Sequence, residues 1–207
     1  LNYKIIKKKV LRSINNLQVS KLYCLMLHNV EVLADSKNLK ILNKSLERLK
    51  KENLIIKKGI SIYDASEIQN FYKTFDPDVV QLPLNVFDQR FLNNGWIEKM
   101  SRDKKEIHLR SIFLQGLLLN KNPTKGFPKF SKDFKKWLVW LKKNKQTNYD
   151  ACLNFVLNQK FKFRLIIGLD NYSQFNQLIK FNKITKDLNF SELACNKKTL
   201  IDPRKWN

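Results

Sequence analysis

Cysteine, histidine and glycine are scarce in this 207-residue sequence, which has three cysteines, two histidines and five glycines. The cysteines, Cys24, Cys152 and Cys195, show no paired spacing and no accompanying histidine cluster. This scarcity argues against a disulfide framework or a zinc site, and it indicates a reducing compartment. No apolar run approaches membrane-spanning length and no signal peptide opens the chain, so we expect a cytoplasmic protein without membrane association.

Acidic residues are also few, with 18 Asp and Glu against 40 Lys and Arg, which gives a formal net charge of +22. Such a charge is typical of proteins that bind nucleic acid, anionic membranes or phosphate-bearing ligands. The lysines are spread along the whole chain and accompany abundant Asn and Ile, as an AT-rich coding sequence also produces. Net charge therefore says more about solubility than about function, and the nucleic-acid interpretation is the weaker one.

Helical and strand patterns alternate along the chain, and hydrophobic residues at 43% provide for a folded core. Helices are predicted over residues 4–17, 65–75, 131–144, 148–159 and 173–183, around Trp96, and from a cap at Asp35 or Ser36 to Lys51. Strands are predicted over residues 22–27, 54–63, 78–82, 106–111 and 163–169. Consecutive strands mostly lie ~25 to 35 residues apart, the length of a right-handed crossover, which indicates a parallel sheet. No glycine-rich dinucleotide fingerprint follows any strand, which favours a barrel over a doubly wound sheet.

Two short buried strands run directly into polar residues, in DVVQLPLNVFDQR (78–90) and EIHLRSIFLQGLLL (106–119). In α/β barrels the ligand-binding groups lie at the carboxyl ends of strands, because the strand fixes the backbone while the following loop is free to vary. The alternative is a pair of core strands with solvated flanks.

Five segments resemble the aldo-keto reductase family in order across nearly the whole chain: VLRSINNLQVSKLYCLMLHNV, IIKKGISIYDASEI, DPDVVQLPLNVFDQRF, EIHLRSIFLQGLLL and RLIIGLDNYSQFNQLI. The resemblance implies an α/β fold of the (β/α)8 TIM-barrel type, as one domain over residues 1–207 with a tail at 188–207. This chain would supply the fourth strand onward and lacks a counterpart of the first three. The family's catalytic Tyr, Asp and Lys come from those earlier strands. Only the histidine at the end of the fourth strand matches, as His28, so we expect the chain to be catalytically incomplete.

The resemblance also implies an NADP-dependent oxidoreductase acting on a small-molecule carbonyl or sugar-like substrate, with NAD left open as cofactor. His28 would orient the carbonyl and share its developing charge. The expected cofactor-binding residues are Ser61 and Gln81 at the nicotinamide carboxamide, Arg110 against the nicotinamide ring, Ser111, Phe113 and Gln115 along the pyrophosphate, and Gly168 and Gln174 at the adenosine end. Ile62 stands where the family usually has Asn. Asp170 and Gln174 stand where NADPH-specific members usually present Lys and Arg.

Two other functions stay open: a noncatalytic nucleotide-binding remnant, and a basic nucleic-acid-binding protein that uses FSKDFKKWLVWLKKNK (130–145). In that segment five apolar residues recur at helical spacing, which is better explained by the buried face of a barrel helix: Phe130, Phe134, Trp137, Leu138 and Leu141. For His108 we expect a packed structural role. The oligomeric state is left open.

Overall fold

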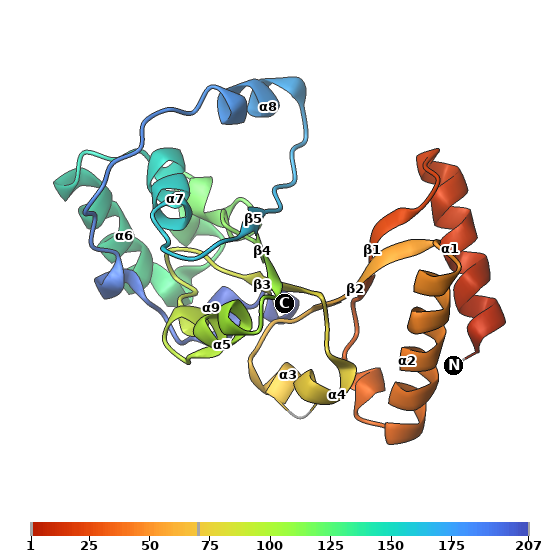
Figure 1. Ribbon diagram of the computed structural model, residues 1–207. Helices are drawn as coiled ribbons and strands as arrows, with labels where there is room; N and C mark the ends of the chain where they lie inside the picture. The colour runs from red at the N-terminus through yellow and green to blue at the C-terminus, as the bar shows by residue number, and fades with distance from the viewer. Residues whose placement is uncertain (1, 70, 207) are drawn as a thin grey trace. The chain divides into compact units, whose positions relative to one another are not determined.

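The computed structural model describes residues 2–69 and 71–206, and it has one five-stranded sheet with the order β1-β2-β3-β4-β5 (Figure 1). The strands are β1 (Leu22–Leu27), β2 (Ile55–Ser61), β3 (Val79–Pro83), β4 (Glu106–Arg110) and β5 (Arg164–Leu165). Strand β2 pairs in parallel with β1 on one side and with β3 on the other. Because the strand order follows the chain, each strand lies beside the next, as in successive βαβ units. The predicted α/β fold is confirmed.

The helices alternate with these strands, as the periodicity predicts. They are α1 (Tyr3–Leu17), α2 (Ser36–Lys51), α3 (Ser66–Gln69), α4 (Tyr72–Phe75), α5 (Trp96–Arg102), α6 (Ser131–Lys143), α7 (Asn148–Leu157), α8 (Tyr172–Ile179) and α9 (Lys198–Ile201). In the described part of the chain, no helix is long and apolar enough to cross a membrane.

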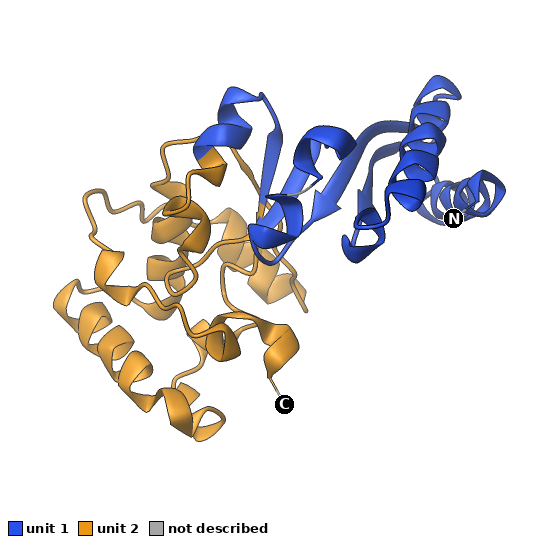
Figure 2. Cartoon of the chain, turned by 90° about the horizontal axis from the view of Figure 1, so that it is seen from below, with its two compact units in different colours: residues 1–82, 98–108 blue, residues 83–97, 109–207 orange. Residues whose placement is uncertain are grey.

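The chain divides into two compact units, which are coloured separately in Figure 2. Unit 1 comprises residues 1–82 and 98–108, and unit 2 comprises residues 83–97 and 109–207. Each unit has its own packed interior. The single domain expected over the whole chain stays a prediction.

In unit 1, α2 covers the sheet with a leucine stripe, Leu39, Leu42, Leu46 and Leu49, in which every side chain is buried. The helix begins where the sequence predicts, because Asp35 Oδ1 accepts hydrogen bonds from Lys37 N at 2.8 Å and Asn38 N at 3.3 Å. Helix α1 packs on α2 and β1. Strand β1 also has the predicted bounds.

The helix predicted over residues 65–75 is wrong as a single element. Two four-residue helices, α3 and α4, take its place, and Phe71 between them has φ −127°, outside the helical range. Two carboxylates accept backbone hydrogen bonds at the start of α3. Glu67 Oε2 accepts from Tyr63 N at 2.7 Å, while Asp64 Oδ1 accepts from Ser66 N at 3.1 Å.

The core of unit 2 is aromatic and centres on α6. Trp137 and Trp140 stack with ring centroids 5.8 Å apart, and Phe190 from the C-terminal tail stacks on Trp140 at 4.5 Å. Trp140 Nε1 also donates to Asn189 O at 2.8 Å. The expected buried face is therefore corrected in two positions. Phe130, which precedes α6, is only half-buried. Leu138 is 41% exposed, and Trp140 is buried in its place because the tail covers that side of the helix.

The strand predicted over residues 163–169 is much shorter than expected. Only β5, two residues long, is regular, and its ladder ends with Ile166 N donating to Leu109 O at 2.8 Å. Beyond it, Ile166 and Leu169 are exposed, so these two apolar side chains are not packed in the core as the predicted strand would require. Helix α8 follows at the end of an extended segment (Figure 1).

Candidate functional site

Ser61, the last residue of β2, and Gln81, the third residue of β3, lie side by side in unit 1. They are register partners in the parallel ladder, and the backbone is fixed just beyond them by Ile62 N, which donates to Gln81 O at 2.9 Å. Paired residues of adjacent parallel strands project from the same face of a sheet. Ser61 is buried and Gln81 is half-buried. A hydroxyl and a primary amide therefore lie side by side in fixed positions.

His28 directly follows β1, and Ser61 is the last residue of β2. The last registered pair of these strands is Leu27 with Ile60, so His28 and Ser61 both come one residue after that pair. The imidazole is exposed, in contrast to Ser61. Unit 1 thus places two of the expected site residues, His28 and Ser61, at the ends of successive strands, with Gln81 beside Ser61 in β3.

Two features limit what else this edge of unit 1 offers. Ile62 is fully buried, so the position at which Asn was expected carries an apolar side chain packed in the core. Two residues before Ser61, a Cβ on Gly59 would come within 2.8 Å of Cys24 Sγ and 3.1 Å of Val79 O. The sheet face two residues before Ser61 is therefore closely packed, with no room for a side chain at Gly59.

In unit 2, β4 ends in a tight segment that we call the exit loop, residues 111–116. Arg110 Nη1 donates to Ser111 Oγ at 3.2 Å, so the guanidinium is directed at the start of the loop. Phe113 stacks on Tyr149 with ring centroids 5.5 Å apart and an interplanar angle of 17°. Gln115 is exposed. Unit 2 therefore brings four expected residues, Arg110, Ser111, Phe113 and Gln115, into one short segment.

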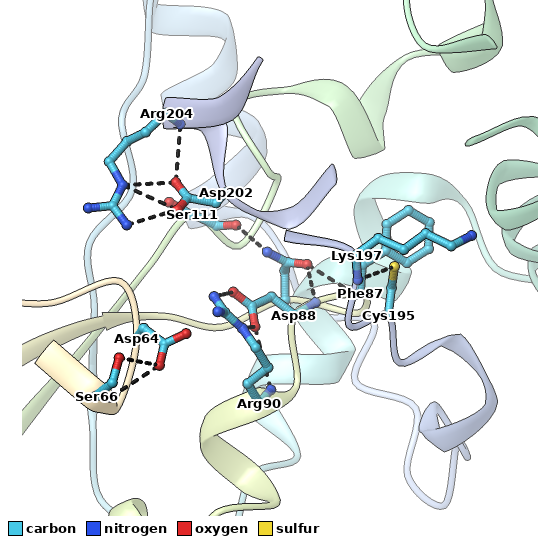
Figure 3. Close-up of polar contacts among 11 residues, drawn as sticks. Asp64, Ser66, Phe87, Asp88, Arg90, Ser111, Cys195, Lys197, Asp202 and Arg204 are labelled. Carbon is cyan, nitrogen blue, oxygen red and sulfur yellow. Dashed lines mark hydrogen bonds and ion pairs between the residues drawn. The ribbon is translucent and has the colours of Figure 1, made fainter. Parts of the chain in front are cut away.

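The loop that follows β3 in unit 2 contains a buried ion pair. Asp88 accepts from Arg90 twice, with Nε 2.8 Å from Oδ1 and Nη2 2.9 Å from Oδ2 (Figure 3). The Asp88 side chain is fully buried and that of Arg90 is 16% exposed. Two parallel bonds of this kind fix the orientation of both side chains.

The remaining expected residues lie at the start of α8. Gly168 is exposed, and a Cβ there would meet nothing within 4 Å. Gln174 Oε1 accepts from Asp170 N at 2.8 Å, and Gln174 N donates to the N-cap Asn171 Oδ1 at 3.0 Å. The amide oxygen of Gln174 thus takes part in helix capping. No Lys or Arg occurs within Tyr172–Ile179, YSQFNQLI, so the charge near this helix start comes from Asp170.

Unit 1 also contains an ionisable cluster that sequence reasoning missed. Glu106 forms an ion pair with Lys57, accepts from Tyr23 Oη at 2.5 Å and lies 2.6 Å from His108 Nε2. Burial alone would raise the pKa of Glu106, but these three hydrogen bonds outweigh it and hold the pKa at about 2. His108 is buried, in agreement with the structural role expected for it. No local pattern predicts the cluster, because its members come from β1, β2 and β4.

The described residues contain no group of three or more His, Cys, Asp or Glu that could hold a metal ion. Among the expected residues, unit 1 offers a hydroxyl, a primary amide and an imidazole, and unit 2 offers a guanidinium. Such groups orient a polar ligand and stabilise charge that develops on it.

The sequence matches the family model described as the aldo/keto reductase family over residues 1–192. Among solved structures, an aldo-keto reductase from Bacillus halodurans in its holo form has a TM-score of 0.74 at 17% identity, covering 99% of this chain and 71% of that chain. A glycerol dehydrogenase from Gluconobacter oxydans has a TM-score of 0.59 at 15% identity, covering 86% of this chain and 63% of that chain. The chain thus spans less than two thirds of the latter, and these likenesses confirm the barrel-type fold. No curated protein sequence matches significantly.

Proposed function

Because this chain belongs to the aldo/keto reductase family, we propose that it is a nicotinamide-dependent oxidoreductase chain whose Ser61 and Gln81 bind the nicotinamide end of the cofactor. The observation that carries the proposal is their pairing across adjacent parallel strands, where Ser61 ends β2. When bound, the cofactor supplies the hydride for carbonyl reduction.

The side chains present fit a carboxamide. The nicotinamide amide group has an acceptor oxygen and donor hydrogens, and a hydroxyl beside a primary amide offers both complements. Since Ser61 is buried and Gln81 half-buried, neither has to be immobilised when the ligand binds. Their role is to fix which face of the nicotinamide ring meets the substrate.

His28 has the second role in this proposal. At the end of β1 its imidazole would hydrogen-bond the oxygen of a small-molecule carbonyl or sugar-like substrate and stabilise the charge that develops there. The family's Tyr, Asp and Lys have no counterpart here, so these 207 residues lack the proton donor. We propose that they hold the dinucleotide and orient a carbonyl without completing the reaction.

For unit 2 we propose the contacts that the family resemblance implies. Arg110, Ser111, Phe113 and Gln115 would contact the nicotinamide and pyrophosphate, and Gly168 and Gln174 the adenosine end. The family expectation is NADP. The carboxylate of Asp170 and the absence of Lys and Arg from Tyr172–Ile179 support NAD at least as well, because a 2′-phosphate requires cationic partners.

Isothermal titration calorimetry with NADH and with NADPH tests the proposal. Gln81→Ala should weaken binding about tenfold, the equivalent of one lost hydrogen bond of about 1.4 kcal/mol. His28→Ala should bind the cofactor as the wild type does, because the imidazole acts on the substrate. Gln69→Ala is the matched control, since it removes an exposed amide on α3.

Two results would contradict this assignment. One is a wild-type chain that binds neither dinucleotide. The other is the reverse pattern, in which His28→Ala weakens binding and Gln81→Ala does not.

A further inference from the structure

In the exit loop, residues 111–116, several residues that have side chains adopt backbone angles that are normally favourable only for glycine. Ser111, Leu114 and Gln115 have φ values of 59°, 48° and 54°, in the left-handed region where residues with a Cβ are disfavoured. Three such residues within five positions hold this conformation only if surrounding contacts impose it.

Apolar burial imposes part of it. Ile112 and Leu114 are buried in unit 2, and Leu114 N donates to Ser111 O at 2.9 Å. Leu118 N then donates to Phe113 O at 3.2 Å. These contacts fix the middle and the end of the exit loop. At its beginning, where the φ of Ser111 first becomes positive, the Ser111 carbonyl accepts a second hydrogen bond from outside the loop.

Asn85 supplies that hydrogen bond from the loop after β3. Its Nδ2 donates to Ser111 O at 3.1 Å, and its Oδ1 accepts from Phe87 N at 3.0 Å and Asp88 N at 2.9 Å. The Asn85 side chain is fully buried. One amide therefore joins two loops. Its three partners, Ser111, Phe87 and Asp88, are labelled in Figure 3.

The loop after β3, which carries Asn85, is itself fixed by hydrogen bonds. Cys195 N donates to Phe87 O at 2.8 Å, and Gln89 Nε2 donates to Val86 O and to Phe190 O, each at 2.8 Å. The paired Asp88 and Arg90 side chains complete these contacts. Because the loop after β3 is fixed in this way, the Asn85 side chain cannot shift easily, and it holds the Ser111 carbonyl in one position.

We propose that Asn85 is a positioning residue, which holds the exit loop in the conformation that binds the dinucleotide. This inference rests on the proposed function, because it assumes that Ser111 and its neighbours contact the cofactor. In this role Asn85 does not contact the cofactor. It acts through the carbonyl of Ser111 and so sets the direction of the backbone that follows.

The geometry makes the amide donor the critical group. Asn85→Asp retains the oxygen that accepts from Phe87 and Asp88 but replaces the donor to Ser111 O by a carboxylate oxygen. When that carboxyl is protonated it becomes a donor again. A positioning role therefore predicts a defect in Asn85→Asp that diminishes as the pH is lowered, whereas Asn85→Ala shows the same defect at every pH.

Asn154 gives a matched control. It is a second fully buried asparagine of unit 2, in α7, whose Nδ2 donates to Gln146 Oε1 at 2.9 Å and whose Oδ1 accepts from Thr185 N at 2.9 Å. Asn154→Asp and Asn154→Ala lose equivalent bonds, but to Gln146 and Thr185, which lie outside the exit loop. A purely structural effect of removing a buried amide should be alike in both pairs of variants.

The experiment measures amide hydrogen exchange of the peptide covering residues 111–118 together with affinity for NADH and NADPH. In the Asn85→Asp variant at pH 7, the amide hydrogens of this peptide should exchange at least tenfold faster than in the wild type. The variant should also bind the dinucleotide about tenfold more weakly. Both defects should shrink, relative to wild type at the same pH, when the pH falls to 5. Asn154→Asp should change neither quantity.

Normal exchange and normal affinity in Asn85→Asp would overturn the proposal, and so would fast exchange with unchanged affinity. If the wild type binds no dinucleotide, the proposed function fails, and exchange in the same variants still decides whether Asn85 holds the loop. If Asn85→Ala does not fold, the conservative Asn85→Asp substitution and its pH dependence decide alone.

Discussion

The ion pair between Asp88 and Arg90 should be among the most sensitive points of unit 2. Arg90→Met keeps the approximate volume of the side chain but leaves the fully buried carboxylate of Asp88 without its charged partner. Breaking a buried pair in this way costs about 3–5 kcal/mol. The cost has an upper limit, because the carboxyl can take up a proton instead.

The upper limit is the free energy needed to protonate the Asp88 carboxyl at the pH of the experiment. Raising an Asp pKa from about 3.9 to 7 corresponds to roughly 4 kcal/mol, at about 1.4 kcal/mol per unit. At pH 5 the same limit is only about 1.5 kcal/mol. We therefore expect Arg90→Met to lower the free energy of unfolding by about 3–4 kcal/mol at pH 7 and by less than half of that at pH 5.

Urea denaturation at both pH values, followed by far-ultraviolet circular dichroism, measures the effect. Lys197→Met is the control in the same unit. Lys197 pairs with Asp133 at 2.7 Å but is 53% exposed, so its loss should cost at most about 1 kcal/mol. The double variant with Asp88→Asn and Arg90→Met should recover at least half of the loss. A cost below about 1 kcal/mol at pH 7, or a cost that does not shrink at pH 5, would contradict this prediction.

Three further predictions concern other parts of the chain. Glu106→Gln should lower stability by about 2 kcal/mol above pH 5. Because the folded pKa of Glu106, about 2, lies below its ordinary value, the wild type loses this contribution as the pH falls from about 4.5 toward 2, and acid denaturation of the variant should show a weaker pH dependence there. Gln174→Arg should increase the affinity for NADPH relative to NADH, because it places a cation beside Asp170; calorimetric titration with both dinucleotides would contradict this if the ratio did not move. Finally, these 207 residues alone should show no carbonyl reduction above background in an assay of NADPH oxidation, and turnover at an ordinary enzymatic rate, typically 1–1000 per second, would mean that another residue donates the proton.

Local patterns predict the elements whose boundaries are set locally. Asp35 begins α2, and Thr147 begins α7 by accepting from Asp150 N at 3.1 Å, because a side chain that caps its own helix needs no distant partner. The choice between Leu138 and Trp140 is different. Both flank the stripe of Phe134, Trp137 and Leu141 at helical spacing, and only the C-terminal tail, which lies about 50 residues further along, decides which one is buried.

In the candidate site, too, some features are predictable from local patterns and others depend on distant contacts. Ser61 and Gln81 are predictable as neighbours, since alternation and parallel pairing fix their face and level. The support of the exit loop by Asn85 is not, because it depends on the backbone turn at Ser111 and on a contact 26 residues away in sequence. Side chains that act through a distant backbone group leave no periodic signal.

The stack of Trp137, Trp140 and Phe190 gives unit 2 an intrinsic optical reporter. Two indole rings inclined by only 15°, with centroids 5.8 Å apart, are close enough for their electronic transitions to couple. The ring of Phe190 and the carbonyl of Asn189 shield Trp140 from water. Detachment of the C-terminal tail would hydrate that indole and shift its emission to the red, so the docking of the tail can be followed without any label.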